Sequence, residues 1–226
     1  MSRPPDSDVA GPTVHRFGRA VRLVHWSVAA LMIVCIGTAA VLYNGSLAVL
    51  FGHRRVVELV HVYAGFALPA PLLLGSLSRA YRADLRRLNR FTPSDWRWLR
   101  SRARRNGAIR VGKFNAGQKL NAALNAGAIA VLFGTGMVMY LPDAVRLSWR
   151  TGATLTHDWF ALAVGLLVVG HITYAVRDPE ALRGMRTGEV SVRWARTEHR
   201  RWAEEVTPPP NPARGAEPVE GRPTGD

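Results

Sequence analysis

Four long apolar stretches constrain what this chain can fold into. They cover roughly residues 23–43, 56–78, 119–141 and 154–176 of 226. Each is about as long as the ~20 residues that a helix needs to cross the hydrocarbon core of a bilayer. Unpaired backbone groups are costly in lipid, so each stretch is expected to be a helix. Two short loops and one long middle loop then predict an all-α integral membrane protein, an up-down bundle of four transmembrane helices.

Basic residues are concentrated in alternate segments between these blocks. Of the 30 Lys and Arg, 4 precede the first block, 12 lie from Arg79 to Lys113, Lys119 opens the third block and 9 follow the fourth, whereas the other two loops hold 2 each. By the positive-inside rule, both termini and the middle loop are expected in the cytoplasm. The formal net charge of +14 could also indicate a nucleic-acid-binding protein. A cytoplasmic membrane loop explains the same Arg-rich run, so no nucleic-acid partner is expected.

The two ends of the chain are expected to be disordered tails. Residues 1–15 and 207–226 are rich in Pro, Gly and charge and have little to bury. The ordered four-helix domain, with a cytoplasmic segment after the last span, is therefore predicted over residues 16–206. The polar start shows no signal-peptide pattern, so the first block is expected to be a retained span. In the second block, Pro69 and Pro71 predict a kink or local unwinding, because proline lacks a backbone donor.

Four of the seven histidines fall inside the predicted spans: His25, His61, His157 and His171. Ionisable groups are rare in lipid and usually functional. The predicted topology places His61 and His157 near the outer side, and His25 and His171 near the cytoplasmic side. His157 and His171 are fourteen residues apart, so they project from nearly the same face of one helix, roughly 21 Å apart. The sequence therefore predicts two layers of two histidines. The remaining histidines are expected to be solvated loop residues: His15, His53 and His199.

Two neutral imidazoles from different helices, at each of two depths, suit haem b. Its iron accepts a nitrogen on each face of the porphyrin, and the apolar macrocycle fits between helices. If histidines fill both axial positions, no position remains for oxygen or substrate, and the expected role of the iron is electron transfer. Zinc would require further ligands in each layer, and a proton relay needs no matched pairs. The residue one turn after each histidine is small, which leaves room for a flat ring: Ala29, Gly65, Ala161 and Ala175. The structural alternative is that each histidine only hydrogen-bonds a neighbouring helix.

Six segments, in order, carry a resemblance to a known family. They are "RLVHWS", "ELVHVYAGF", "GKFNAGQKLN", "LTHDWF", "VGHITYAV" and "GMRTGEVSVRWARTEHRRW". This pattern resembles the di-haem cytochrome b, or gamma, subunit of bacterial membrane-bound formate dehydrogenases. The resemblance extends over nearly the whole predicted ordered region. The most specific part is "NAGQK" together with the four histidines of the spans.

The resemblance implies a function and a set of site residues. It implies an inner-membrane subunit that passes electrons from an iron-sulfur (beta) subunit through two b haems to quinone. Formate oxidation would lie on a separate catalytic (alpha) subunit that holds molybdenum or tungsten. His61 and His157 would ligate the outer haem, and His25 and His171 the inner one. The quinone site would lie on the cytoplasmic side near the inner haem and use residues of the "NAGQK" loop, with one haem ligand nearby: Asn115, Gly117, Gln118 and His171.

Other interpretations of these residues stay open. Asn115 could simply cap the third span. Lys113 and Lys119 could attract a reduced, anionic quinone, and Phe114 stands where the family is expected to have Tyr. The same bundle could serve a hydrogenase or another molybdenum oxidoreductase as its cytochrome b subunit. A haem-free membrane anchor is the alternative from another functional class.

Overall fold

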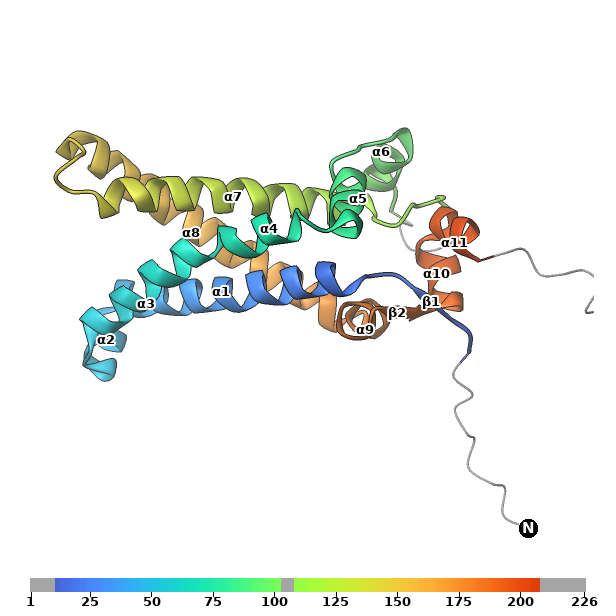
Figure 1. Cartoon of the computed structure of the whole chain (residues 1–226), viewed down its shortest axis with the longest axis horizontal. Coiled ribbons are helices and arrows are strands. Elements are labelled where there is room, and N and C mark those ends of the chain that lie inside the picture. The colour runs from blue at the N-terminus through green and yellow to red at the C-terminus, as the bar shows by residue number, and fades with distance from the viewer. Residues whose placement is uncertain (1–10, 103–107, 208–226) are drawn as a thin grey trace, which may run out of the picture.

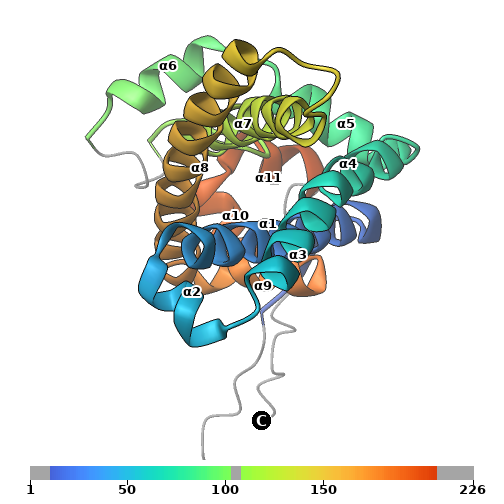
Figure 2. The same cartoon turned by 90° about the vertical axis from the view of Figure 1, so that its left-hand side faces the viewer.

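Four helical segments long and apolar enough to cross a membrane form the body of the molecule (Figure 1). The structure, a computed structural model, describes residues 11–102 and 108–207. Figure 2, which looks along the bundle, shows the segments around a common axis, with neighbours in sequence lying side by side. The segments are α1 (Arg19–Tyr43), α3 (Arg54–Ala67) continued by α4 (Pro69–Gly75), α7 (Ala116–Tyr140) and α8 (Leu147–Val176). The predicted all-α membrane bundle is confirmed.

The helices are longer at their N-terminal ends than the apolar blocks predicted. α1 begins at Arg19 rather than at residue 23, and α8 begins at Leu147 rather than at residue 154. Hydropathy marks only the part of a helix that suits lipid. Backbone hydrogen bonding continues into the polar flanks, so the helix extends beyond its apolar part.

The second span is broken at its prolines. α3 ends at Ala67, α4 begins at Pro69, and the Leu68 N–H between them donates to the carbonyl of Gly65 at 3.3 Å, a tighter turn than that of an α-helix. Pro69 and Pro71 bring no N–H to the ladder. The irregularity predicted from the two prolines lies at this junction, and the chain continues in the same general direction (Figure 1).

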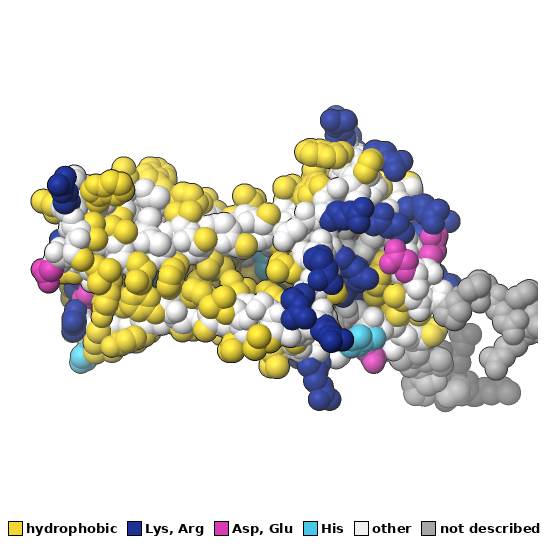
Figure 3. Space-filling model, turned by 45° about the horizontal axis from the view of Figure 1, so that its top comes forward, with side chains coloured by type: hydrophobic (Ala, Val, Ile, Leu, Met, Phe, Trp, Pro, Cys, Tyr) yellow, Lys and Arg dark blue, Asp and Glu magenta, His cyan; other side chains and the backbone are white. Residues whose placement is uncertain are grey.

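The core of the bundle is small, and much apolar surface faces outward. Buried side chains from all four spans meet in one cluster: Met32, Leu68, Ala128, Ile129 and Val164. Large exposed apolar residues cover the outside of the spans, and Figure 3 shows them as a broad hydrophobic surface along the bundle. Surface of this kind and extent is what a protein presents to lipid.

The two ends of the bundle differ in charge. One end carries α2 (Gly45–Phe51) and the α7–α8 connection. The other, here called the basic end, carries α5 (Arg79–Leu88), α6 (Pro93–Arg100), α9 (Pro179–Thr187), α10 (Val192–Glu198), α11 (Arg200–Val206) and a two-stranded sheet. Lys and Arg side chains gather at the basic end (Figure 3).

The sheet corrects part of the predicted N-terminal tail. β1 (Thr13–His15) pairs antiparallel with β2 (Glu189–Ser191), and Val190, the central residue of β2, is fully buried. Residues 13–15, predicted to belong to a disordered tail, are therefore ordered, because a distant segment supplies their backbone partners. Residues 1–10 and 208–226, the rest of the predicted tails except for Gly11, Pro12 and Thr207, lie outside the described residues.

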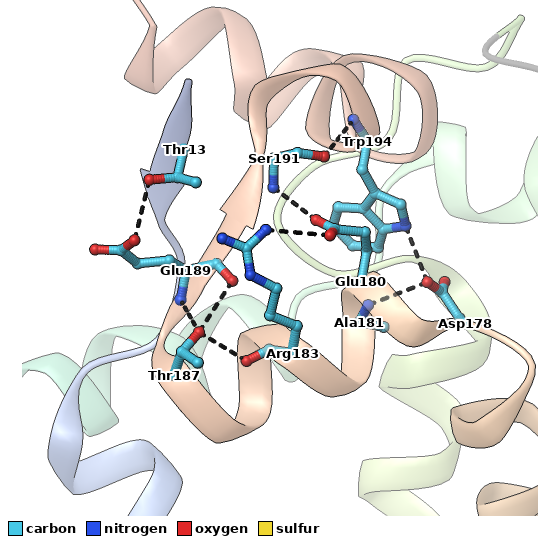
Figure 4. Close-up of polar contacts among 9 residues, drawn as sticks. All are labelled: Thr13, Asp178, Glu180, Ala181, Arg183, Thr187, Glu189, Ser191 and Trp194. Carbon is cyan, nitrogen blue, oxygen red and sulfur yellow. Dashed lines mark hydrogen bonds and ion pairs between the residues drawn. The ribbon is translucent and has the colours of Figure 1, made fainter. Parts of the chain in front are cut away.

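A polar network holds the segment after α8 in place (Figure 4). The Asp178 carboxylate accepts hydrogen bonds from the backbone N–H of Ala181 and from Trp194 Nε1, both at 3.0 Å, which ties the start of α9 to α10. The Glu180 carboxylate accepts from the Ser191 N–H at 2.7 Å. Burial alone would raise the pKa of Glu180, but hydrogen bonds from Ser191 and Arg183 outweigh it, so the pKa is lowered.

A buried ion pair joins α6 to the first turn of α7. Lys119 Nζ donates to Asp95 Oδ2 at 2.7 Å and to the carbonyl of Arg90 at 2.8 Å, and the side chains of Lys119 and Asp95 are each 6% exposed. Burial alone would raise the pKa of Asp95. Hydrogen bonds from Lys119 and Thr92, with the charge of Lys119, outweigh it, and the pKa is lowered.

Replacing one partner of this pair should destabilise the fold. Lys119→Met leaves the Asp95 carboxylate buried without its cation, which should cost about 3–5 kcal/mol. The matched control is Arg55→Met, because Arg55 pairs with Glu58 in an exposed position, and such pairs contribute about 0–1 kcal/mol. Thermal unfolding in detergent, followed by circular dichroism, measures both. Equal unfolding temperatures for the two variants would contradict this account.

Candidate histidine and quinone site

The structure brings the four histidines of the spans together in two pairs. The ring centroids of His61 on α3 and His157 on α8 lie 6.2 Å apart. Those of His25 on α1 and His171 on α8 lie 6.1 Å apart. The layers expected from topology are therefore present as side-chain pairs, and α8 contributes one ring to each.

The separation within each pair fits two imidazoles that bind one metal ion from opposite sides. A metal–nitrogen distance of about 2.0 Å places the centroids of two such rings roughly 6 Å apart. Among residues 11–102 and 108–207, no group of three or more His, Cys, Asp or Glu side chains is arranged to hold a metal ion. Two imidazoles without further protein ligands suit an iron whose other ligands come from a macrocycle.

Threonine hydroxyls hold both rings of the outer pair. Thr38 Oγ1 lies 2.9 Å from His61 Nδ1, and Thr135 Oγ1 lies 2.9 Å from His157 Nδ1. Each Nδ1 is occupied by this contact, which leaves Nε2 as the nitrogen available to a metal. Metal-ligating histidines are commonly oriented in this way by a partner on the second ring nitrogen. The sequence did not single out either threonine, because Thr38 is 23 residues from His61 and Thr135 is 22 from His157.

The inner pair has a different environment. His25 Nδ1 is buried and has no hydrogen-bond partner among the described residues. The edge of the Trp26 ring meets the His25 ring at a centroid distance of 5.1 Å. A buried nitrogen without a partner costs about 1–3 kcal/mol, so its presence calls for a compensating gain at this ring. Metal binding through the ring would provide one.

Space for a flat group is present beside the outer pair. A Cβ built on Gly65, one turn after His61, would meet no atom within 4 Å outside its own helix segment. A Cβ on Gly136 would come within 3.6 Å of His157 Cε1. The absence of a side chain at Gly65 therefore leaves room on the same face as His61, as a bound macrocycle requires.

Asn115 and Gln118 form the first turn of α7 as a capping box. The Gln118 N–H donates to Asn115 Oδ1 at 2.9 Å, and the Asn115 N–H donates to Gln118 Oε1 at 3.0 Å. The capping role considered for Asn115 is therefore confirmed. The two side-chain amide nitrogens have no hydrogen-bond acceptor among the described residues, so they are available as donors. Gly117 lies between them, and a Cβ there would meet the Trp98 ring at 3.1 Å.

His171 lies at the same end of the bundle as this capping box, near the C-terminal end of α8. Its closest aromatic partner is His25. No hydrogen bond joins His171 to Asn115, Gly117 or Gln118 among the described residues. The four predicted quinone-site residues thus share one end of the molecule. Three of them lie in the first turn of α7, and His171 is not in hydrogen-bond contact with that turn.

The two lysines of this region do not stand free, contrary to the expectation that they attract an anionic quinone. Lys113 Nζ donates to both carboxylate oxygens of Asp84 at 2.6 Å, and Lys119 is paired with Asp95. Burial lowers the pKa of Lys113, which the carboxylate of Asp84 partly offsets. Their positive charges are thus already balanced within the protein.

The segment that leads into Asn115 is anchored by a buried Arg–His contact. Arg16 Nη2 donates to the carbonyl of Lys113 and to His199 Nε2, both at 2.9 Å, and His199 Nδ1 donates to the carbonyl of Gly112 at 2.7 Å. The Arg16 guanidinium also lies 4.6 Å from the centroid of the Trp194 ring. Burial lowers the pKa of Arg16 to about 9, partly offset by nearby carboxylates.

This contact corrects the expectation that His199 is a solvated loop residue. His199 is 1% exposed, because α10 and α11 fold back against the segment before α7. Its Nδ1 faces a carbonyl oxygen, which can only accept, so Nδ1 carries the proton and Nε2 accepts from Arg16. The C-terminal segment therefore fixes the approach to the capping box.

Comparisons with known proteins agree with this geometry. The chain is 32% identical over 104 residues to the cytochrome b556(Fdn) subunit of the nitrate-inducible formate dehydrogenase of Escherichia coli K12. The counterparts of Escherichia coli O157:H7 and Shigella flexneri give the same values. These matches cover 42% of this chain and 46% of each relative, so the chain spans about half the length of the curated relatives it matches.

A family model described as prokaryotic cytochrome b561 matches residues 16–188, which include α1, α3, α4, α7, α8 and all four paired histidines. Membership of this family implies haem b as the cofactor. The two imidazole pairs fit this cofactor. Since the match extends over well more than half of the sequence, the chain belongs to the prokaryotic cytochrome b561 family.

Proposed function

We propose that this chain is the membrane-anchoring cytochrome b subunit of a formate dehydrogenase and carries electrons from an iron-sulfur subunit to quinone through two b haems. The observation that carries the proposal is the pair of histidine layers, with ring centroids 6.2 and 6.1 Å apart. The names of the curated relatives support formate dehydrogenase as the parent complex.

The histidines would hold one haem in each layer. His61 and His157 would bind the outer iron, and His25 and His171 the inner iron. Haem b, when bound, supplies a one-electron carrier at each depth. With both imidazoles of a layer engaged, the iron would carry electrons and would not bind oxygen or substrate. The rings on α8 are fourteen residues apart, roughly 21 Å along the helix axis, so one rigid element fixes the spacing of the two layers.

The first turn of α7 would bind quinone at the basic end. Quinone oxygens accept hydrogen bonds, and this turn offers donors that the capping box does not use: Asn115 Nδ2, Gln118 Nε2 and the Gly117 N–H. The first N–H groups of a helix lack partners within that helix, which leaves Gly117 able to donate. His171, a ligand of the inner layer, lies at this end of the bundle and would border the quinone.

The charge asymmetry supports a bacterial inner-membrane location with the basic end in the cytoplasm. Quinone would then be reduced on the cytoplasmic side. The outer histidine pair would face the iron-sulfur subunit across the end that carries α2. A catalytic subunit with molybdenum or tungsten would oxidise formate beyond it.

Removing one histidine should remove one haem. The purified protein should show b-type bands in reduced-minus-oxidised spectra and two haems per chain in the pyridine assay. His61→Ala and His171→Ala should each retain one haem, because each disrupts only one pair. His53→Ala is the control, since His53 lies in the connection before α3, outside both pairs, and should leave two haems. A folded protein without haem, or loss of both haems from one substitution, would argue against the proposal.

Two isosteric substitutions separate capping from quinone binding. Asn115→Asp and Gln118→Glu keep the side-chain oxygen that closes the capping box and lose the amide donor. Both should fold normally, because Asp caps helices as well as Asn and acidic residues suit a helix N-terminus. Reduction of a quinone analogue by the intact complex should fall about tenfold, as expected for one lost hydrogen bond of about 1.4 kcal/mol.

The control for these variants is Asn44→Asp. Asn44 caps α2 at the opposite end, where its side chain accepts from the Leu47 N–H at 3.2 Å. This substitution should leave quinone reduction unchanged. Unchanged quinone reduction in Asn115→Asp and Gln118→Glu as well would show that the turn serves only to begin the helix.

Co-purification tests the parent complex. A tagged chain isolated from mild detergent should bring with it an iron-sulfur subunit and a molybdenum or tungsten subunit that reduces a dye with formate. Mass spectrometry identifies both. Recovery of a hydrogenase in place of these subunits would keep the electron-transfer role and reject formate dehydrogenase.

A further inference from the structure

The two histidine layers differ in what holds the second nitrogen of each ring. In the outer layer, Nδ1 of His61 and Nδ1 of His157 each lie 2.9 Å from a threonine hydroxyl. In the inner layer, His25 Nδ1 is buried without a partner among the described residues, and His171, which is exposed, makes no hydrogen bond within residues 11–102 and 108–207. Both outer rings therefore have a hydrogen-bond partner on Nδ1, whereas neither inner ring has one among the described residues.

The direction of the outer hydrogen bonds follows from the threonine backbone contacts. Thr38 Oγ1 lies 2.7 Å from the carbonyl oxygen of Val34, and Thr135 Oγ1 lies 2.7 Å from that of Val131. A carbonyl can only accept, so the single hydroxyl hydrogen is used there. Each threonine oxygen must therefore accept a hydrogen bond from the imidazole Nδ1–H. This arrangement fixes the tautomer that leaves Nε2 free to bind a metal.

A hydrogen bond donated by Nδ1–H makes the opposite nitrogen a stronger donor to iron. The effect is reinforced because each threonine hydroxyl is itself polarised by the carbonyl that it faces. Stronger donation stabilises ferric iron relative to ferrous iron and lowers the reduction potential, one of the means by which a protein tunes haem. Among the described residues, the inner rings have no such acceptor.

We infer that Thr38 and Thr135 are positioning residues that hold the reduction potential of the outer haem below that of the inner haem. The inference rests on the proposed function and adds a direction to it. Transfer of one electron from the outer haem, which would be oxidised, to the inner haem, which would be reduced, would then be favoured. No proton is transferred, and no covalent bond is formed or broken in this step. The gradient runs toward the basic end, where the proposed quinone site lies.

Valine substitutions test this directly, because valine keeps the shape of threonine and removes the hydroxyl. In Thr38→Val and in Thr135→Val, an optical redox titration should show two haems, with a raised midpoint potential for the outer haem and an unchanged one for the inner haem. The double variant should raise the outer potential further. The outer component is identified in the His171→Ala protein, which retains only the outer haem.

Two controls separate electronic tuning from packing. Thr173→Val removes a hydroxyl whose only hydrogen bond within the described part of the chain is to the carbonyl of Val169, at 2.8 Å, in the same i to i−4 pattern. It should leave both potentials unchanged. Thr38→Ser keeps the hydroxyl and should restore the unsubstituted potential. If Thr38→Val binds only one haem, the Thr38→Ser and Thr135→Val proteins provide the measurement.

Two results would overturn the inference while leaving the proposed function intact. One is an unchanged outer potential in both valine variants with two haems bound. The other is an outer potential above the inner one in the unsubstituted protein. Absence of haem from the unsubstituted protein, detected by the pyridine assay, would instead remove the proposed function itself.

Discussion

The structure depends on how a bilayer treats polar groups. Without water, backbone groups must form their hydrogen bonds within helices. An imidazole in a span needs a partner that offsets the free-energy cost of its desolvation. Four helices satisfy the first requirement. The second is met by placing four imidazoles in two pairs whose rings lie about 6 Å apart. The prokaryotic cytochrome b561 family, to which the chain belongs, uses haem b, and both pairs fit an iron held from two sides.

Buried polar contacts hold the basic end of the bundle together. The buried pairs Lys113–Asp84 and Lys119–Asp95 connect the segments before and within α7 to α5 and α6. Arg16, through its hydrogen bonds to His199 and to the carbonyl of Lys113, adds the two ends of the described chain to the same assembly. The first turn of α7 and the segment before it are therefore held on several sides by buried polar contacts.

Much of this could be predicted from the sequence, and the rest could not for identifiable reasons. Apolar block lengths predicted the four spans, and charge with helix spacing predicted the two histidine layers. Thr38 and Thr135 gave no signal, because their role depends on contacts between different helices. His199 looked solvated because nothing local shows that α10 and α11 fold back. Strand β1 has only three residues, too few for a periodic pattern, and its partner is far along the chain.

In the proposed function, each histidine pair binds one haem through both rings. Near-infrared magnetic circular dichroism of the oxidised purified protein, combined with EPR, reports the axial ligands of each ferric haem. We expect two low-spin haems per chain, each with two imidazole ligands. A single haem, a high-spin iron or an axial ligand other than histidine in either layer would contradict it.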